Sequence, residues 1–366
     1  MKLLRAVATF SLAAWFVFAP LPSYARRPPE YIAGAVSVMC AATGLVLYEA
    51  NQHRLHYPAS IVKVMTALIV LENTTDLNEI VTLSERAVAL PWYAANMGLL
   101  EGDAMTLWEA LHGIMLPSAN EVANALAEHV AGSVEDFIEK MNRRAHELGA
   151  VNTYFVNACG LPGEGQHTTA YDVSLIMRQA VTHPVFLQVI STAFFDFPPS
   201  QRHPQGRTLR NTNRLVRYGD DLHTEWVVGG KTGWIRAARN TLTTYSVQDG
   251  RGLIVTVLYT EYREATFADT ITLLSHGFAL LAEVPLPAAA QPREESTGNS
   301  TQNSSGVIFL PVTEGVPAPN PENTADPPVP SSPWEALRFF TLTLLKIFAG
   351  AAALAGTGIL VLLWKK

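Results

Sequence analysis

The chain of 366 residues carries a formal net charge of −6, is 48% hydrophobic and has a mean hydropathy of +0.14. Lysine and arginine do not cluster between its two ends, which argues against nucleic acid as a partner. The histidines and the two cysteines show no metal-ligand spacing, so we expect neither a metal site nor another cofactor. The length allows one large domain with additional segments, or two domains.

The first 25 residues have the pattern of a secretory signal peptide. Lys2 and Arg5 precede an apolar stretch over residues 6–19, and a small-x-small cleavage pattern ends at Ala25. The apolar stretch is too short to span a bilayer comfortably. We therefore expect export, cleavage after Ala25, and a folded catalytic domain over residues 26–284.

Apolar periodicity predicts strands at both ends of this domain and helices between them. A turn at Thr43-Gly44 between alternating apolar residues predicts a β-hairpin, and residues 241–246 and 253–260 have strand character. Helices are predicted over residues 107–116, 120–130, 134–148, 171–180 and 266–282. This order favours an α+β fold over βαβ repeats.

Ser60 and Lys63 lie three residues apart at the start of an almost wholly apolar run. Because Pro58 cannot lie inside a helix, we predict that Ser60 lies in the first turn of a buried helix, with Lys63 on the same face. Burial lowers the pKa of a lysine amine, which lets it act as a base for the serine. An S-x-x-K motif also occurs by chance on many helices, so alone it is weak evidence.

Two further motifs strengthen this interpretation. S-A-N at 118–120 follows a proline at a predicted helix–helix connection, where it presents a hydroxyl and an amide. K-T-G at 231–233 lies on a predicted strand, where the glycine lets a ligand approach the backbone. Between residues 26 and 284 only three lysines occur, and two of them belong to these motifs. S-x-x-K, S-x-N and K-T-G in this order on an exported chain form a specific signal.

The three motifs resemble those of the serine D-alanyl-D-alanine carboxypeptidases, the low-molecular-weight penicillin-binding proteins. The similarity extends over residues 33–281 and includes N-T-N-R-L at 211–215. It implies a five-stranded antiparallel sheet flanked by helices, with the site between the sheet and a helical lobe. It also implies that the enzyme removes the last D-alanine from peptidoglycan stem peptides ending in D-Ala-D-Ala, through an acyl-enzyme, and that β-lactams acylate it.

The resemblance gives the first two motifs their roles. Ser60 would be the acylated nucleophile, and Lys63 would accept its proton. Ser118 would relay a proton to the leaving D-alanine, and Asn120 would hold the substrate amide.

The third motif would bind the other end of the substrate. Lys231 and Thr232 would hold the terminal carboxylate beside Gly233. The backbone N–H groups of Ser60 and Trp234 would form the oxyanion hole.

Two stretches depart from the family pattern after K-T-G. Trp234-Ile235 stands where the family has His, Tyr or Phe followed by Thr, and A-A-R-N at 237–240 stands where Ala-Gly is frequent. Both departures affect the expected fit of the substrate more than the acylation machinery.

The C-terminal part replaces the all-β domain that many members of this family carry. Residues 285–335 form a Pro/Ser/Asn-rich linker, and the stretch 285–333 would span on the order of 40 Å as a flexible coil. Residues 347–364 are 18 residues without a charge, long enough to cross a bilayer, and two lysines follow them. We expect residues 336–366 to form a transmembrane anchor with a short cytoplasmic tail, which leaves the domain on the cell-wall side.

Two other functions remain open at this point. A β-lactamase needs a positioned carboxylate for deacylation, and Glu164 lies in a Gly/Pro loop without an E-x-x-L-N context. A non-catalytic envelope protein could bind muropeptides or a partner, although retention of Ser60 and Lys63 speaks against it. In an exported protein Cys40 and Cys159 could form a disulfide.

Overall fold

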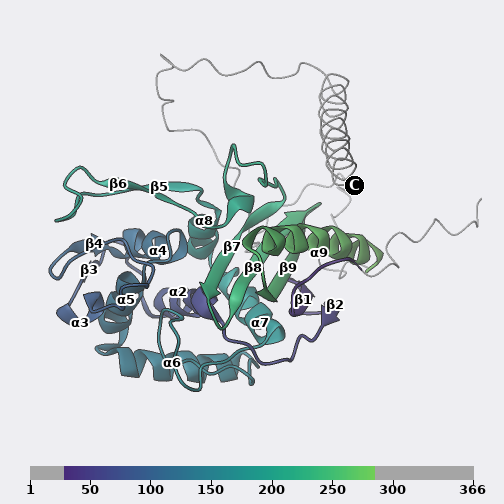
Figure 1. The fold of residues 1–366 in the computed structure, drawn as a ribbon, viewed down its shortest axis with the longest axis horizontal. Helices are drawn as coiled ribbons and strands as arrows, with labels where there is room; N and C mark the ends of the chain where they lie inside the picture. The colour runs from purple at the N-terminus through teal and green to yellow at the C-terminus, as the bar shows by residue number, and fades with distance from the viewer. Residues whose placement is uncertain (1–28, 285–366) are drawn as a thin grey trace, which may run out of the picture. The chain divides into compact units, whose positions relative to one another are not determined.

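A five-stranded antiparallel sheet runs through residues 29–284, the part of the chain that the computed structural model describes (Figure 1). The strands lie in the order β2–β1–β9–β8–β7, so the two ends of this part of the chain supply neighbouring strands. Their bounds are β1 (Ala35–Cys40), β2 (Val46–Ala50), β7 (Val227–Ile235), β8 (Arg239–Gln248) and β9 (Arg251–Thr260). The predicted α+β fold, its five-stranded sheet and its N-terminal hairpin are confirmed.

Helices cover both faces of the sheet. Successive side chains of a strand point to opposite faces. Accordingly Val255 of β9 packs with α9 (Arg263–Glu283), whereas Thr256 bonds to Ser174 of α7 (Ala170–Ala180). By length and composition α9 could cross a membrane. Its apolar side chains are instead buried in the core against the strands, so α9 closes the domain.

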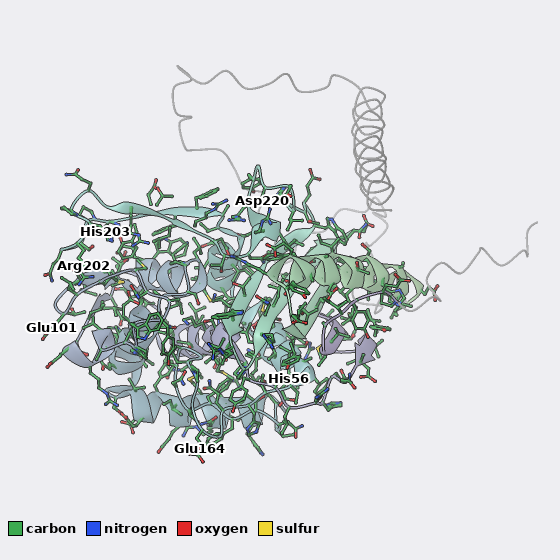
Figure 2. All side chains as sticks on the ribbon, viewed as in Figure 1. His56, Glu101, Glu164, Arg202, His203 and Asp220 are labelled. Carbon is green, nitrogen blue, oxygen red and sulfur yellow. The ribbon has the colours of Figure 1, made fainter. Side chains whose placement is uncertain are left out.

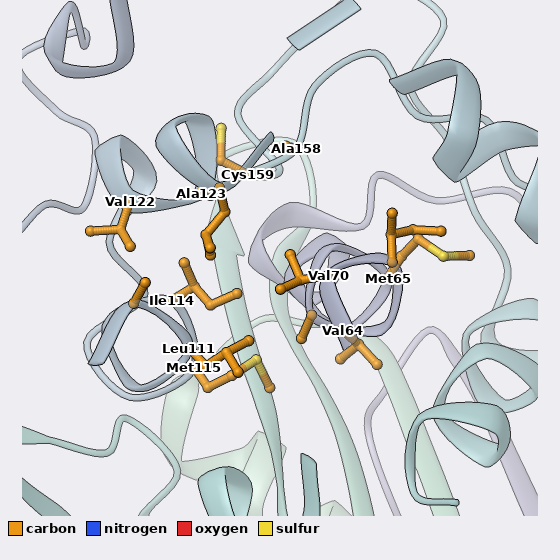
Figure 3. Packing of buried hydrophobic residues seen from close by; sticks show 14 of the residues in the cluster. Val64, Met65, Val70, Leu111, Ile114, Met115, Val122, Ala123, Ala158 and Cys159 are labelled. Carbon is orange, nitrogen blue, oxygen red and sulfur yellow. The ribbon is translucent and has the colours of Figure 1, made fainter. Parts of the chain in front are cut away.

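A helical lobe is built around α2 (Val62–Asn73), whose residues 62–70 are all buried. A helix that is apolar on every side needs neighbours all round. These are α4 (Leu107–Met115), α5 (Asn120–Ala131), α6 (Val134–Glu147), α7 and α8 (Pro184–Ser191). Figure 3 shows Val70 of α2 among side chains that include Ile114 of α4 and Val122 of α5. This packing fixes the position of the residues at the start of α2.

Capping residues explain why the predicted helices begin close to their predicted starts. Thr106 caps α4 in a capping box with Glu109, and Ser133 accepts a hydrogen bond from the backbone N–H of Asp136 at the start of α6. Thr169 caps α7 in the same way. The helices predicted over 107–116, 120–130, 134–148, 171–180 and 266–282 are confirmed to within a few residues.

Several short elements were not predicted: β3 (Ile80–Thr82), β4 (Ala104–Thr106), β5 (Phe194–Phe197), β6 (Arg207–Arg210) and a 3₁₀ turn at Arg214–Val216. The short helix α3 (Glu85–Val88) begins directly after Ser84, where the sequence predicts a helix start, and Ser84 caps it. The tip of the β5–β6 hairpin lies on the loop before β4, where Gln201 bonds to the Glu101 carbonyl and to Asp103. Figure 2 shows Arg202 and His203 at this end of the molecule, near Glu101.

Cys40 and Cys159 are both buried free thiols in separate core clusters, so the disulfide considered from the sequence is not formed. The predicted signal peptide (1–25), linker (285–335) and transmembrane anchor (336–366) lie outside the described residues.

Candidate active site

Ser60 lies in a 3₁₀ turn over Ala59–Ile61, directly before α2. Lys63 follows in the first turn of α2, and its Nζ lies 3.3 Å from Ser60 Oγ. The predicted shared face is therefore confirmed, but Ser60 precedes the α-helix and does not lie in its first turn. The physical reason is Ala59, whose φ of +52° is incompatible with a right-handed α-helix.

Lys63 has no solvent exposure, and its Nζ reaches three acceptors. These are Asn120 Oδ1 at 2.6 Å, the Cys159 carbonyl oxygen at 2.6 Å and Ser60 Oγ at 3.3 Å. Burial lowers the pKa of Lys63 to about 8, against an opposing contribution from the Glu121 carboxyl. A neutral amine keeps two N–H groups for the two carbonyl oxygens and turns its lone pair to Ser60. Lys63 is thus arranged as a base for the Ser60 hydroxyl.

Two glycines allow the backbone to pack closely around Ser60. A Cβ added at Gly160, whose φ is +86°, would lie 2.0 Å from the Ala59 carbonyl oxygen. A Cβ added at Gly233 would lie 2.9 Å from the backbone nitrogen of Ser60. The K-T-G strand therefore passes directly beside Ser60, and only glycine permits this approach.

Ser118 and Asn120 lie at the connection between α4 and α5. Ser118 is 6% exposed, has a φ of +72°, and its Oγ has no hydrogen-bond partner within residues 29–284. Asn120 is the first residue of α5, where the sequence predicts the helix to begin, and its Oδ1 accepts a hydrogen bond from Lys63. A strained backbone and an unpaired buried hydroxyl are features that functional sites retain.

Lys231 of β7 is also fully buried, and Thr232 precedes Gly233 on the same strand. Lys231 Nζ donates only to the Thr232 carbonyl oxygen, at 3.2 Å, and forms no ion pair within the described residues. Burial, with a smaller contribution from the charge of Lys63, lowers the pKa of Lys231 well below its ordinary value. A buried ammonium without a counter-ion favours an anion beside it, so this end of the site suits a carboxylate.

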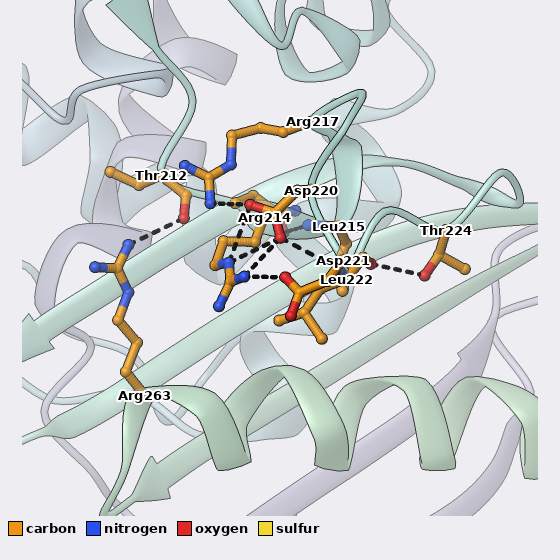
Figure 4. Close-up of polar contacts among 10 residues, drawn as sticks. Thr212, Arg214, Leu215, Arg217, Asp220, Asp221, Leu222, Thr224 and Arg263 are labelled. Carbon is orange, nitrogen blue, oxygen red and sulfur yellow. Dashed lines mark hydrogen bonds and ion pairs between the residues drawn. The ribbon is translucent and has the colours of Figure 1, made fainter. Parts of the chain in front are cut away.

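The loop before β7 supports Thr232. Thr232 Oγ1 donates to Thr212 Oγ1 at 2.7 Å, and Arg263 Nη2 donates to the Thr212 carbonyl oxygen at 3.3 Å. Figure 4 shows this loop and the ion pairs of Arg214 with Asp220, whose two carboxylate oxygens lie 3.0 Å from Arg214 Nε. The hydrogen bonds from Arg214 hold the pKa of Asp220 well below its usual range. This network fixes the loop against the K-T-G strand.

Trp234 is 65% exposed at the open edge of the sheet, because β7 is an edge strand. It pairs in register with Asn240 across the β7–β8 hairpin. Asn240 Nδ2 donates to the Thr260 and Glu261 carbonyl oxygens at 3.0 and 3.1 Å, which ties the hairpin to the end of β9. Both departures from the family pattern thus lie at one hairpin next to Ser60.

Comparison with known proteins identifies the family. Residues 23–261 match the family model described as D-alanyl-D-alanine carboxypeptidase, which is more than half of the chain. The chain belongs to the D-alanyl-D-alanine carboxypeptidase family.

Individual relatives agree with this assignment. The D-alanyl-D-alanine carboxypeptidase DacF of Bacillus subtilis is 31% identical over 67% of this chain, which spans 61% of the relative's length. The D-alanyl-D-alanine carboxypeptidase DacB2 of Mycobacterium tuberculosis is 34% identical, and the match covers 65% of this chain and 79% of the relative's length. The crystal structure of the Streptomyces K15 DD-transpeptidase is 28% identical, with a TM-score of 0.63 over 69% of this chain and 99% of that one.

Some residues of this carboxypeptidase-family site could not be found from the sequence. The Cys159 carbonyl contributes through its backbone, which no side-chain motif marks. Thr212 lies in the N-T-N-R-L stretch that is part of the family resemblance. That stretch could have indicated that Thr212 belongs to the site. Asp172, in the first turn of α7, accepts hydrogen bonds from the Asn152 backbone N–H and the Thr153 hydroxyl and so ties the helix start to the preceding loop. Residues 29–284 contain no group of three side chains that could hold a metal ion.

Proposed function

We propose that this protein is a serine-type D-Ala-D-Ala carboxypeptidase that removes the terminal D-alanine from peptidoglycan stem pentapeptides. The observation that carries the proposal is Lys63, a fully buried amine that lies 3.3 Å from Ser60 Oγ and binds two carbonyl oxygens with its other donors. This is the arrangement that an activated serine nucleophile requires.

In the proposed reaction Ser60 Oγ attacks the carbonyl carbon of the penultimate D-alanine, and Lys63 takes the hydroxyl proton. The backbone N–H groups of Ser60 and Trp234 stabilise the oxyanion. Ser118 relays the proton from Lys63 to the amine of the leaving D-alanine, while Asn120 holds the substrate amide. The C–N bond then breaks, and water hydrolyses the Ser60 ester to release the shortened peptide.

Binding of the terminal carboxylate is assigned to Lys231 and Thr232, and it requires no cofactor. Support comes from the buried, unpaired ammonium of Lys231 and from the close approach of Gly233 to the Ser60 backbone. A β-lactam carries a carboxylate near a strained amide, so it would enter the same site and acylate Ser60.

The alternatives have less support. Glu164, the carboxylate that a β-lactamase would need, is exposed at the edge of the molecule (Figure 2). A non-catalytic muropeptide-binding protein would have no need of a buried base beside the serine, and burying a lysine costs free energy.

We further propose that residues 1–25 direct export and that residues 336–366 anchor the enzyme in the cell membrane, with residues 26–284 on the cell-wall side. The support is the sequence pattern alone: the short apolar stretch that ends before Ala25, and the uncharged stretch 347–364 followed by lysines.

Intact-mass measurement after incubation with a penicillin tests the proposed nucleophile. The protein should gain one β-lactam mass, located at Ser60 by peptide mapping, and a Ser60→Ala variant should gain none. Labelling that persists in Ser60→Ala would show that another residue is the nucleophile.

A further inference from the structure

A stem peptide bound as proposed above would run along β7 toward the tip of the β7–β8 hairpin. Its terminal carboxylate lies at Lys231 and Thr232, and its scissile carbonyl lies at Ser60, beside Gly233. The part of the peptide that remains on the enzyme therefore continues past Trp234. Strand residues advance about 3.3 Å each, so Arg236 lies about 10 Å beyond Gly233. Two or three residues of extended peptide cover that distance.

The hairpin tip presents two unpaired arginines there. A three-residue turn over 236–238 joins β7 to β8. Arg236 opens this turn, Arg239 follows it as the first residue of β8, and both are exposed. Within residues 29–284 neither guanidinium forms an ion pair. Glu261 lies beside this hairpin, because its backbone carbonyl oxygen accepts a hydrogen bond from Asn240. Its side chain is exposed and unpaired with either arginine.

The backbone of Arg239 supports a role for its side chain. Its φ is +56°, in the left-handed region that favours glycine. A residue with this conformation directly after a hairpin turn is commonly a glycine. The hydrogen bonds from the neighbouring Asn240 to the end of β9 hold the conformation in place. Glycine would serve folding better here, and an outlier of this kind at the end of the strand that passes Ser60 points to a function.

We propose that the β7–β8 hairpin tip is a subsite for the acyl part of the substrate. Arg236 and Arg239 bind a free carboxylate on the third or fourth residue from the carboxyl end of the stem peptide, and Trp234 packs against the peptide between them and Ser60. This subsite rests on the proposed carboxypeptidase function and specifies its substrate: stem peptides with free carboxylates at these residues are preferred to the same peptides with carboxamides.

Two synthetic pentapeptides test the subsite, one with a free carboxylate at these residues and one with a carboxamide. D-Alanine release by the full chain in detergent gives kcat/KM for each. We expect a preference of about three- to tenfold for the carboxylate peptide, the size that two exposed ion pairs supply. The preference should fall toward one in an Arg236→Gln/Arg239→Gln double variant, and in the unaltered protein at 0.5 M NaCl.

Two further variants separate binding from folding. Arg202→Gln, at the distant tip of the β5–β6 hairpin (Figure 2), removes an exposed arginine elsewhere and should keep the full preference. Arg239→Gly suits the left-handed backbone, so its Tm should not fall, yet the preference should shrink. A shrunken preference at an unchanged Tm cannot result from damage to the fold.

The outcomes distinguish this inference from the proposed function. Release of D-alanine from both peptides at equal kcat/KM overturns the subsite and leaves the carboxypeptidase. A preference that survives in the double variant overturns the assignment to these arginines. Absence of D-alanine release from either peptide, together with no acylation by penicillin, overturns the proposed function itself.

Discussion

Lys63 differs from an ordinary lysine in one property, the ease with which it gives up its proton. Burial lowers its pKa from an ordinary value of 10.5 to about 8. At pH 7 about one Lys63 in ten is then neutral, compared with fewer than about one in a thousand for an exposed lysine. The two carbonyl oxygens that accept hydrogen bonds from Nζ hold the amine in place in either protonation state.

The rate of acylation by penicillin should therefore rise with pH until the pH passes about 8, because only the neutral amine can accept a proton. Lys63→Arg keeps the charge but removes the base, since arginine stays protonated. We expect it to lower the acylation rate by about 10²-fold or more and to remove the rise near pH 8. Stopped-flow acylation across pH 6 to 10 is the measurement. A near-normal rate for Lys63→Arg at neutral pH would mean that Lys63 is not the base.

Glu121 lies next to Asn120 in the chain and is buried, with one carboxylate oxygen 2.6 Å from the backbone nitrogen of Met97. Its negative charge raises the pKa of Lys63, although burial raises the pKa of Glu121 itself. Glu121→Gln keeps an acceptor for Met97 and removes the charge. The pKa of Lys63 should then fall further, so the midpoint of the acylation pH profile should move to lower pH. A midpoint that stays in place would show that Glu121 is uncharged or too distant to act on Lys63.

At the scale of elements, the active site depends on the loop that carries Gly160. This loop supplies the Cys159 carbonyl to Lys63 and packs against the turn that contains Ser60. Asn157 closes it by accepting hydrogen bonds from the backbone nitrogens of Cys159 and Gly160 at 3.2 and 2.6 Å. The position of Ser60 is thus set in part by a loop that is distant in the chain.

Gly160→Ala should disable the enzyme, because the new Cβ would overlap the Ala59 carbonyl oxygen and push the Ser60 turn away. Gly165→Ala is a matched control: its φ is +84°, close to the +86° of Gly160, but nothing lies within 4 Å of the added Cβ. Both changes should cost about 1–3 kcal/mol through backbone strain. Only Gly160→Ala should also lower penicillin acylation, by at least about 10-fold. Equal acylation by the two variants would contradict this role of the loop.

The elements that sequence reasoning predicted are those determined by nearby residues in the chain. Apolar periodicity and capping residues such as Thr106 and Ser133 located the long helices, and the turn at residues 43–44 located the first hairpin. Short strands such as β3 and β5 carry too few residues for a period to be recognised.

The parts of the site that sequence reasoning missed depend on contacts between residues that are far apart in the chain. The Cys159 carbonyl meets Lys63 across 96 positions of the chain, and Thr241 donates to the Pro58 carbonyl oxygen across 183. Such contacts arise only when the sheet and the helical lobe have come together. Ala59 has a left-handed backbone conformation, which places Ser60 in a 3₁₀ turn. The same packing holds this conformation, and no local sequence pattern predicts it.

At the scale of the whole molecule, the two ends of residues 29–284 come together in one sheet. The first and last strands of this part lie side by side, since β1 pairs with β9 over residues 35–40 and 253–258. Helix α9 then covers the sheet with Phe267, Leu273 and Leu274 buried. The fold therefore needs no residue after α9 to cover its sheet, and the predicted linker and anchor would serve to position the enzyme.

A chain ending at Val284 should accordingly be soluble without detergent and should release D-alanine from a free pentapeptide as fast as the full chain. On intact cell wall it should be slower, because a membrane anchor raises the effective concentration of the enzyme near its substrate. The measurement is D-alanine release by the two proteins side by side in detergent, first on the peptide and then on purified wall with membranes. A loss of tenfold or more on the free peptide would show that residues after Val284 contribute to the catalytic fold, and the linker would then be more than a tether.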